Sequence, residues 1–407
     1  MKAASVFQTI TPKNEFYLVG YFDDIRKLPA LGVHDEPYVN LMLLKDGDCS
    51  LLFVAIDVCI VSKEKIEPVK RRLSEKLGIP YDRITVNSIH SHSCANGFDT
   101  ELPAPKDNPE YVDYVGETIV RAALTLPDKL TEVRAEYLKT NVRGWYSNRN
   151  DKTKPFDDEA VLLRFLDGSG RAAGAFLNFN CHATVVGPQN RYLTTDVIGE
   201  VRRNLTDFAG IMPYTFTGAS GDLGNRQFRR GHGFEELSRV GAGISGEIKK
   251  GAFRPISMEG FHLKFFDYHV RYDNTKYFEE YRASLEQVRS ALASGKLTAD
   301  QTKNRLAEEE QLKGKLTVEQ VDFHIVCKII TLGGVQIVTF PGELASIFGM
   351  RIKQSSKAAL PLVLGYADGY HGYFVPESDY GTTYESLVSR MPKGETEKMI
   401  DELRKCL

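Results

Sequence analysis

The sequence predicts an α/β protein with a mixed central β-sheet, helices covering that sheet, and a helical hairpin inserted late in the chain. Continuous apolar runs such as 51–56 are typical of strands that are buried on both faces. The helical spacing of apolar residues over 62–77 falls between two such runs and gives a β-α-β order. A strongly charged segment, 277–315, carries a narrow apolar stripe at helical spacing. These observations together indicate one elaborated α/β domain.

The first part of the chain contains a hairpin followed by a β-α-β unit. The turn Lys45-Asp46-Gly47-Asp48 separates two of its strand candidates. Strands are expected over 16–21, 38–44, 50–61 and 84–89. The helix over 62–77 ends at Gly78 and Pro80, which stop helices. Asp57, at the end of a central strand, is expected to be a partner of the site or a helix cap.

The same signals place the later elements. Further strands are expected over 132–138, 160–166, 172–180, 214–216, 323–332, 335–340 and 362–366. Further helices are expected over 109–126, 197–209, 234–250 and 277–315, the last broken near Gly295 to make the hairpin around 275–316. The segments 96–108 and 140–150 are polar and are expected to be loops. The order predicts sites at the carboxyl ends of the strands.

Composition limits the function. The 407 residues carry a formal charge of −2, which favours neither nucleic acid nor an anionic membrane as a partner. No apolar run approaches the ~20 residues of a membrane-spanning helix, so an integral membrane protein is not expected. The six cysteines form no Cys-x-x-Cys pair and are expected to be buried free thiols. A cytoplasmic location is expected, or a secreted one if a signal peptide has been removed.

The stretch 84–97 is the most informative, because a β-branched strand there leads into His90-Ser91-His92-Ser93. If the backbone stays extended, His90 and His92 point the same way. One imidazole can then bind a metal while the other faces the reacting group. Two hydrogen-bonded histidines at a strand end remain the alternative on this stretch alone.

Other strand ends add polar groups. His182 directly follows the apolar strand 174–180, as His90 follows its own strand, and strand-end histidines are natural metal ligands. Glu343 follows the strand 335–340. Small residues precede Ser220 and Asp222, which suggests that the backbone approaches a ligand closely there. The loop 140–150 holds two arginines and the one tryptophan, and is either a wall for the substrate or a solvated loop.

His90-Ser91-His92-Ser93 resembles the His-Thr-His-Ser motif of neutral, non-lysosomal ceramidases, which are zinc amidases. Further blocks that resemble this family occur in the same order across nearly the whole chain. These blocks are Gly20-Tyr21, Asp57, Asn148-Arg149, His182, Gly221-Asp222, Pro341-Gly342-Glu343, Gly372-Tyr373 and Tyr384-Glu385. The resemblance implies that residues 1–407 form a single catalytic domain of this kind, without the β-sandwich that follows it in the family.

The resemblance also implies roles for particular residues. The implied zinc ligands are His90, His182, Glu343 and Tyr373, with Tyr370 as the alternative fourth ligand. Imidazole and carboxylate suit zinc, and a phenolate oxygen is a less common ligand. The implied catalytic residues are His92 as general acid/base, Tyr384 and Asp222, and the implied substrate-binding residues are Arg149, Ser220 and Gly224. Tyr384 or Arg149 would stabilise the developing oxyanion.

One departure concerns the substrate. Gly224 stands where the family has its proposed active-site serine, unless Ser220 serves instead. We therefore expect a zinc-dependent hydrolase that cleaves the amide bond of a small N-acyl compound, with a lipid of sphingolipid metabolism as one candidate. The alternatives are an esterase or amidase for a small polar substrate, and a catalytically silent binding protein. Arginines within 148–152 and 225–230 predict a polar and anionic N-acyl substrate rather than ceramide.

Overall fold

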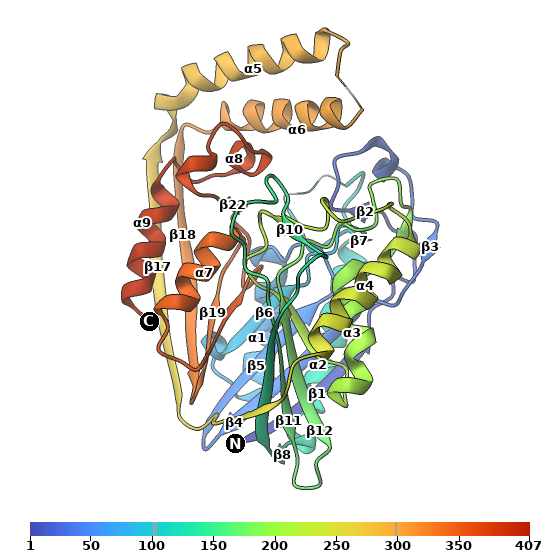
Figure 1. The fold of residues 1–407 in the computed structure, drawn as a ribbon, viewed down its shortest axis with the longest axis vertical. Helices are drawn as coiled ribbons and strands as arrows, with labels where there is room; N and C mark the ends of the chain where they lie inside the picture. The colour runs from blue at the N-terminus through green and yellow to red at the C-terminus, as the bar shows by residue number, and fades with distance from the viewer. Residues whose placement is uncertain (101, 103, 298) are drawn as a thin grey trace.

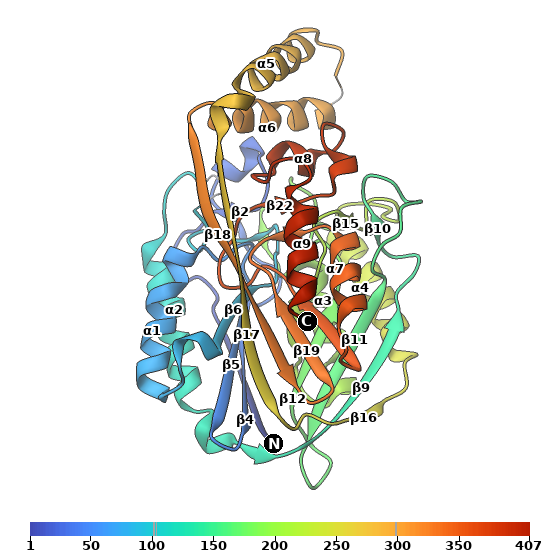
Figure 2. The same cartoon turned by 90° about the vertical axis from the view of Figure 1, so that its left-hand side faces the viewer.

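The predicted β-α-β order occurs three times in the computed structural model, which describes residues 1–100, 102, 104–297 and 299–407. Figures 1 and 2 show helices on the outside of the sheets and the α5/α6 hairpin at one end of the molecule. The predicted α/β class with a helical hairpin is confirmed. Its strands form three large mixed sheets, rather than one central sheet, among the described residues.

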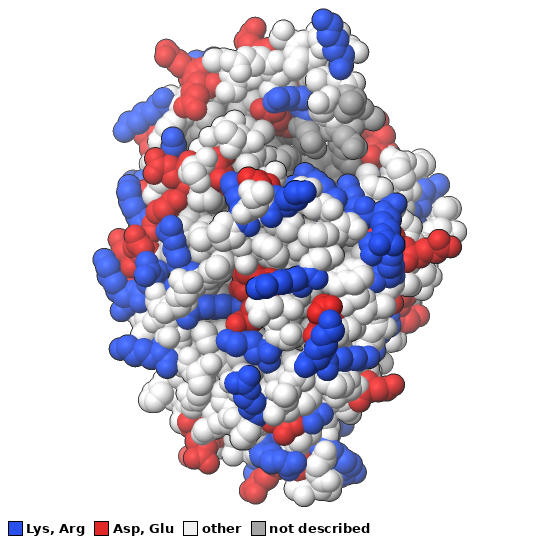
Figure 3. Space-filling view, in the orientation of Figure 1, with Lys and Arg blue, Asp and Glu red and all other residues white. Residues whose placement is uncertain are grey.

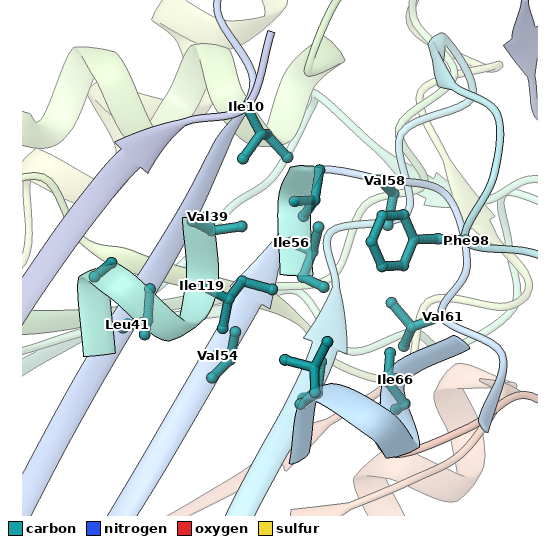
Figure 4. Packing of buried hydrophobic residues seen from close by; sticks show 14 of the residues in the cluster. Ile10, Val39, Leu41, Val54, Ile56, Val58, Val61, Ile66, Phe98 and Ile119 are labelled. Carbon is teal, nitrogen blue, oxygen red and sulfur yellow. The ribbon is translucent and has the colours of Figure 1, made fainter. Parts of the chain in front are cut away.

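The first sheet has the order β6-β5-β4-β1-β8. Its strands are β1 (Lys2–Thr9), β4 (Tyr38–Asp46), β5 (Cys49–Ile56), β6 (Ile84–Ser88) and β8 (Thr131–Glu132). α1 (Lys63–Leu77) connects β5 to the parallel strand β6. α1 and α2 (Pro109–Leu124) cover one face of this sheet, where residues such as Val54, Ile66 and Ile119 pack together (Figure 4).

The second sheet has the order β14-β12-β11-β9-β16. Its strands are β9 (Arg134–Asn141), β11 (Glu159–Leu166), β12 (Ala172–Phe179), β14 (Tyr214–Thr217) and β16 (Arg254–Ile256). α3 (Asp196–Ala209) connects β12 to the parallel strand β14. α3 and α4 (Phe234–Lys249) bury their apolar residues against one face of this sheet.

The third sheet has the order β17-β18-β19-β21. Its strands are β17 (Phe261–Asp273), β18 (Gln320–Leu332), β19 (Val335–Thr339) and β21 (Leu360–Leu364). α7 (Ser346–Ser355) connects β19 to the parallel strand β21, and α9 (Glu395–Lys405) packs beside α7. The helices α5 (Phe278–Ala293) and α6 (Ala299–Lys315) continue from the ends of β17 and β18, and α6 lies against α8 (Tyr384–Val388).

Short strand pairs join the loops beyond the sheets. They are β2 (Leu18–Val19) with β7 (Cys94–Ala95), β3 (Gly32–Val33) with β13 (Tyr192–Leu193), β10 (Ser147–Asn148) with β15 (Leu223–Gly224), and β20 (Glu343–Leu344) with β22 (Tyr373–Phe374). The 3-10 turns are η1 (Asp24–Lys27), η2 (Tyr81–Arg83), η3 (Pro127–Lys129), η4 (Asn274–Tyr277) and η5 (Glu377–Asp379). Several of these pairs lie between the sheets and the α5/α6 hairpin (Figure 1).

One hydrophobic core is shared by the three sheets. It contains Phe53 of β5, Phe176 of β12 and Leu362 of β21, and the rings of Phe53 and Phe176 are 5.3 Å apart edge to face. Backbone hydrogen bonds then tie the strand ends together: the N–H that ends β6 donates to Tyr366 O (3.2 Å), and Gly365 N–H donates to the last carbonyl of β14 (2.9 Å). The carboxyl ends of β6, β14 and β21 therefore meet at one place.

Three further expectations have outcomes here. No helix of the described residues is long and apolar enough to cross a membrane. All six cysteines are free, four of them buried and Cys49 and Cys406 half-buried. Residues 101 and 103 of the expected loop 96–108, and residue 298 of the expected helical segment, lie outside the described residues.

Candidate metal centre

His90 lies just past the end of β6, and its backbone turns there. Its φ of 64° is left-handed, so the expected extended path through His90 and His92 is wrong: the strand ends at Ser88. The His90 ring stacks on Tyr366, with centroids 4.1 Å apart. Its Nδ1–H donates to the carbonyl of Cys59 (2.9 Å), because a carbonyl can only accept. This bond directs Nε2 toward the strand ends.

His182 follows β12 and faces His90. Its Nδ1–H donates to the carbonyl of Ser220 (3.2 Å), and its Nε2 lies 3.1 Å from His90 Nε2. Burial, and then the charge of Arg149, lower the pKa of His182 well below its usual range, so this imidazole is neutral at pH 7. Since the proton of the neutral ring is on Nδ1, the lone pair of Nε2 faces His90.

Glu343 supplies the carboxylate at this point. Its Oε2 lies 3.3 Å from His90 Nε2 and 3.7 Å from His182 Nε2, and it has no hydrogen-bond partner among the described residues although it is buried. Its Oε1 accepts a hydrogen bond from Tyr370. Ligand atoms around one tetrahedral zinc at ~2.0–2.2 Å lie roughly 3.3–3.6 Å from each other. The donor types, their separations and the unpartnered Oε2 therefore fit a zinc ion, and Nδ1–carbonyl bonds are the usual support of such histidines.

His92 borders these three groups. Its Nε2 is 3.1 Å from His90 Nε2, but it forms no ion pair with Glu343 in the part of the chain that the structure describes. Gly20 lies directly behind it, because a Cβ at Gly20 would be 2.4 Å from His92 Cα. Burial lowers the pKa of His92 well below its usual range, and the neighbouring His90 and Arg149 lower it further. His92 is therefore a neutral, half-buried imidazole beside the carboxylate-bearing cluster.

Tyr373 and Tyr370 reach the cluster from β22 and the turn before it. β22 pairs with β20, which places the backbone of Tyr373 opposite Glu343. The Tyr373 hydroxyl accepts a hydrogen bond from Arg149 (3.2 Å), whereas the Tyr370 hydroxyl donates to Glu343. Burial and then the Glu343 charge raise the pKa of both hydroxyls. The choice of Tyr373 or Tyr370 as fourth ligand stays a prediction.

Arg149 and Tyr384 form the opposite wall. The Nε of Arg149 pairs with Glu385 (2.5 Å), whose other oxygen accepts from Asn150 (2.9 Å). The ring of Tyr384 lies 6.2 Å from that of Tyr373, and burial raises the pKa of Tyr384 to about 12. Both predicted residues therefore lie beside the cluster. Glu385, which fixes the guanidinium of Arg149, was not predicted as a site residue.

The side chains of two predicted residues, Asp222 and Ser220, bind partners outside the cluster, whereas a third residue, Gly224, borders it. Asp222 accepts from Ser346 N–H (2.7 Å) and from the Asn148 amide (2.8 Å), so its carboxylate fastens β10 to the start of α7. Ser220 bonds the Tyr366 hydroxyl through its own hydroxyl (2.9 Å). A Cβ at Gly224 would lie 3.8 Å from Arg149 and 3.9 Å from His182, so Gly224 borders the cluster with room for a small side chain.

Two other expectations need correction. Asp57 neither caps a helix nor contacts a cluster histidine: its carboxylate forms a fully buried bidentate pair with Arg202 of α3 (2.8 and 2.5 Å). Trp145, in the loop expected to be either a wall for the substrate or solvated, packs against Gly243 of α4 and under the guanidinium of Arg239 (5.2 Å). In that loop only the end near Arg149 reaches the site.

Comparison with known proteins finds similarity to the same family that the sequence motifs resemble. No protein-family profile matches the chain. Neutral ceramidase of Drosophila melanogaster is 23% identical over 208 residues, which cover 46% of this chain and 29% of that protein. Neutral ceramidase of Oryza sativa is 23% identical over 223 residues, which cover 50% and 28%. The matched stretch thus spans less than a third of the curated relatives' length.

Solved structures match the whole chain. The crystal structure of neutral ceramidase from Pseudomonas aeruginosa superposes with a TM-score of 0.73 at 18% identity, covering 100% of this chain and 75% of that one. A structure described as ceramidase complexed with C2 gives a TM-score of 0.75 at 16% identity, with the same coverage. The fold is that of the neutral ceramidase structures, and the sequence matches support the same family.

Proposed function

We propose that this chain is a zinc-dependent hydrolase that cleaves the amide bond of an N-acyl compound. The supporting observation is the convergence of His90 Nε2, His182 Nε2 and Glu343 Oε2, with both imidazole protons held by backbone carbonyls on the far side. Three lone pairs facing one point repel each other unless a cation lies between them. Tyr373 would complete the ligand set. When bound, zinc supplies Lewis acidity that polarises a carbonyl and makes water a stronger acid.

The chain's own residues would move the protons and hold the amide. His92 is neutral and half-buried, and its Nε2 faces the ligand cluster. It would accept the proton of the attacking water and donate it to the leaving amine, so the acyl carbon–nitrogen bond breaks as the acyl carbon–oxygen bond forms. Arg149, fixed by Glu385, would donate to the carbonyl oxygen as charge develops there, with Tyr384 beside it.

Metal analysis with two histidine variants tests this proposal. Purified protein should carry close to one zinc per chain, and His182→Ala should lose it. His92→Ala should keep zinc and lose about 10²–10⁴-fold in rate on N-acyl substrates, the usual effect of removing a general acid/base. The exposed residue His262 gives a matched control, His262→Ala, which should change neither property.

The outcomes separate the alternatives. Equal zinc loss in His92→Ala and His182→Ala would contradict the division of roles between these histidines. A zinc-loaded protein that hydrolyses esters but no amides would be an esterase. A zinc-loaded protein that hydrolyses neither would be a binding protein on this fold. A protein that takes up no zinc would refute the proposal at its first step.

A further inference from the structure

The loop after β15 forms part of the rim of the candidate site. It starts at Gly224, which borders His182 and Arg149, and Gln227 then donates to the carbonyl of Arg149 (3.4 Å). At the far end of the loop the His232 carbonyl accepts from the N–H of Gly187 (3.4 Å), in the segment after His182. The loop thus runs from the Arg149 side of the cluster to the segment that follows His182. Figure 3 shows a hollow beneath the α5/α6 hairpin with Lys and Arg side chains gathered along its edge.

Tyr21 connects this rim to His92. Its ring lies 5.1 Å from the His92 ring, and its hydroxyl donates to the carbonyl of Val186 (3.0 Å). The guanidinium of Arg26 lies over the same ring at 5.0 Å. Tyr21 is therefore a wall one aromatic ring away from the proposed proton carrier.

Arg26 is a buried cation with no carboxylate in direct contact among the described residues, although the charge of Asp23 acts on it. Only 4% of the residue is exposed. Its Nε donates to the Pro188 carbonyl (3.0 Å) and one terminal nitrogen to the Ser93 hydroxyl (3.3 Å), while the other terminal nitrogen has no partner. Among the described residues it forms no ion pair within 4.0 Å. Such a charge leaves a positive field on the Tyr21 side of the site, because a desolvated guanidinium is stabilised by an anion.

Arg229 lies in the rim loop between Gln227 and His232, and the His232 carbonyl accepts from Gly187, the residue after Val186, whose carbonyl accepts from Tyr21. Arg229 is half-buried, and its side chain makes neither a hydrogen bond nor an ion pair with any other part of the described chain. Burial, and then the charge of buried Asp196, raise the pKa of the Tyr21 hydroxyl, and the charges of Arg26 and Arg229 oppose that rise. Other half-buried arginines do have carboxylate partners: Arg203 pairs with Asp35, and Arg239 pairs with its helix neighbour.

We infer that Arg229, with Arg26 behind Tyr21, forms a subsite for a carboxylate on the substrate, which makes N-acyl amino acids the substrate class. This inference rests on the proposed amide hydrolysis. In an N-acyl amino acid a single carbon separates the carboxylate from the amide nitrogen. An amide held at His92 would therefore place its carboxylate near Tyr21, where a planar guanidinium can donate two hydrogen bonds to it.

Binding of a matched pair of analogues tests the subsite without turnover. The probes are a ketomethylene analogue of an N-acyl glycine, in which CH₂ replaces the amide NH, and its primary amide, which lacks the negative charge. Each is titrated calorimetrically into the zinc-loaded full chain. The acid should bind at least tenfold more tightly than the amide. Arg229→Gln should remove that difference, leave the affinity for the neutral amide unchanged and keep the zinc. Arg230→Gln, which changes the exposed neighbouring arginine, should behave like the wild type.

Each outcome decides the inference. Equal binding of acid and amide by the wild type would overturn it. A preference for the acid that persists in Arg229→Gln would assign the carboxylate to the metal and would overturn it as well. Hydrolysis is scored separately: cleavage of ceramide with equal binding of the analogues would leave the hydrolase standing and remove the subsite. A carboxylate preference lost in Arg229→Gln, without cleavage of any amide, would support the subsite and refute the hydrolase.

Discussion

Replacing Glu343 with glutamine should have opposite effects on the metal-free and the zinc-loaded protein. In the metal-free chain the buried Oε2 faces His90 Nε2 at 3.3 Å with no hydrogen atom between them. The glutamine amide would put an N–H donor there, remove a buried charge, and still accept from Tyr370 through its oxygen. Replacing a buried charge that lacks a full set of partners is often neutral or stabilising by about 1–4 kcal/mol. Metal-free Glu343→Gln should therefore melt at or above the wild type.

The zinc response should shrink in the same variant. At a free zinc concentration of about 100 times Kd, binding stabilises the wild type by about 2.7 kcal/mol. With ~2.1 cal/mol/K of unfolding entropy per residue, the 407 residues convert this into a rise in Tm of about 3 °C. If losing the carboxylate weakens zinc binding about 100-fold, only about 0.4 kcal/mol remains, which is below 1 °C. Differential scanning calorimetry with and without zinc measures both effects.

The control is Glu319→Gln, the same substitution at an exposed glutamate outside the site, which should leave both melting temperatures unchanged. A metal-free Glu343→Gln that melts below the wild type and still gains the full zinc shift would refute this reasoning.

Four further substitutions probe the surroundings of the site. Gly20→Ala should lower the free energy of unfolding by about 1–3 kcal/mol and slow turnover, because φ at Gly20 is +112° and the new Cβ would be 2.4 Å from His92 Cα. Gly224→Ser should instead fold and bind zinc normally. Measurements of activity and of metal content distinguish the two variants. Arg202→Met should lower the free energy of unfolding by about 3–5 kcal/mol, measured by chemical denaturation, because it leaves the buried Asp57 carboxylate without its ion-pair partner. Burial raises the pKa of the Asp222 carboxyl group from 3.8 to about 6. The protonated carboxyl group therefore contributes stability below pH 4, and this stability is lost as the pH rises through 6. Relative to Asp222→Asn, the wild type should lose about 2 kcal/mol of unfolding free energy between pH 4 and pH 7, and a difference that does not vary with pH would contradict this.

The sequence predicted those elements whose own pattern determines them. The hairpin over 38–61, the helix that follows it and the strand that leads to His90 all have a clear period and clear end signals. The expected strand over 50–61 is too long, because β5 ends at Ile56 and the apolar residues after it are buried as a loop. β1 and β17 were not predicted. β17 pairs with β18 along its whole length, and its sequence alternates apolar and polar residues over 261–265 and, shifted by one residue, over 266–273, so this strand had a signal that the prediction missed.

The sequence predicted which residue types of the candidate site follow the ends of strands, but not the contacts that those residues make. His90, His182 and Glu343 each follow an apolar strand, and the structure brings their ligand atoms within 4.8 Å of each other. The left-handed turn at His90 had no signal, because glycine and asparagine are the usual residues for that conformation. The roles of Glu385 and Tyr366 depend on contacts between segments far apart in the chain, and no local pattern of a single sequence reveals such contacts.

The arrangement of the three sheets explains why the candidate ligands come from such distant segments. Each large sheet contains the same unit: an antiparallel hairpin, then a helix, then a strand parallel to the hairpin's second strand. These units are β4-β5-α1-β6, β11-β12-α3-β14 and β18-β19-α7-β21. The units share only apolar runs, so no repeat is visible in the sequence. Each unit contributes one group: His90 follows the last strand of the first unit, whereas His182 and Glu343 follow the middle strands of the other two.

This origin has a consequence for folding. Among the described residues no single sheet supplies all three candidate ligands, so these groups meet only after the three sheets have packed on the core around Phe53 and Phe176. The backbone bonds between the ends of β6, β14 and β21 hold the strand ends together without help from the metal. Zinc should therefore add a few kcal/mol to an already folded chain rather than drive its folding, in contrast to small domains that unfold when the metal is removed. The candidate metal centre would then depend on the packing of the sheets, whereas the packing would not depend on the metal.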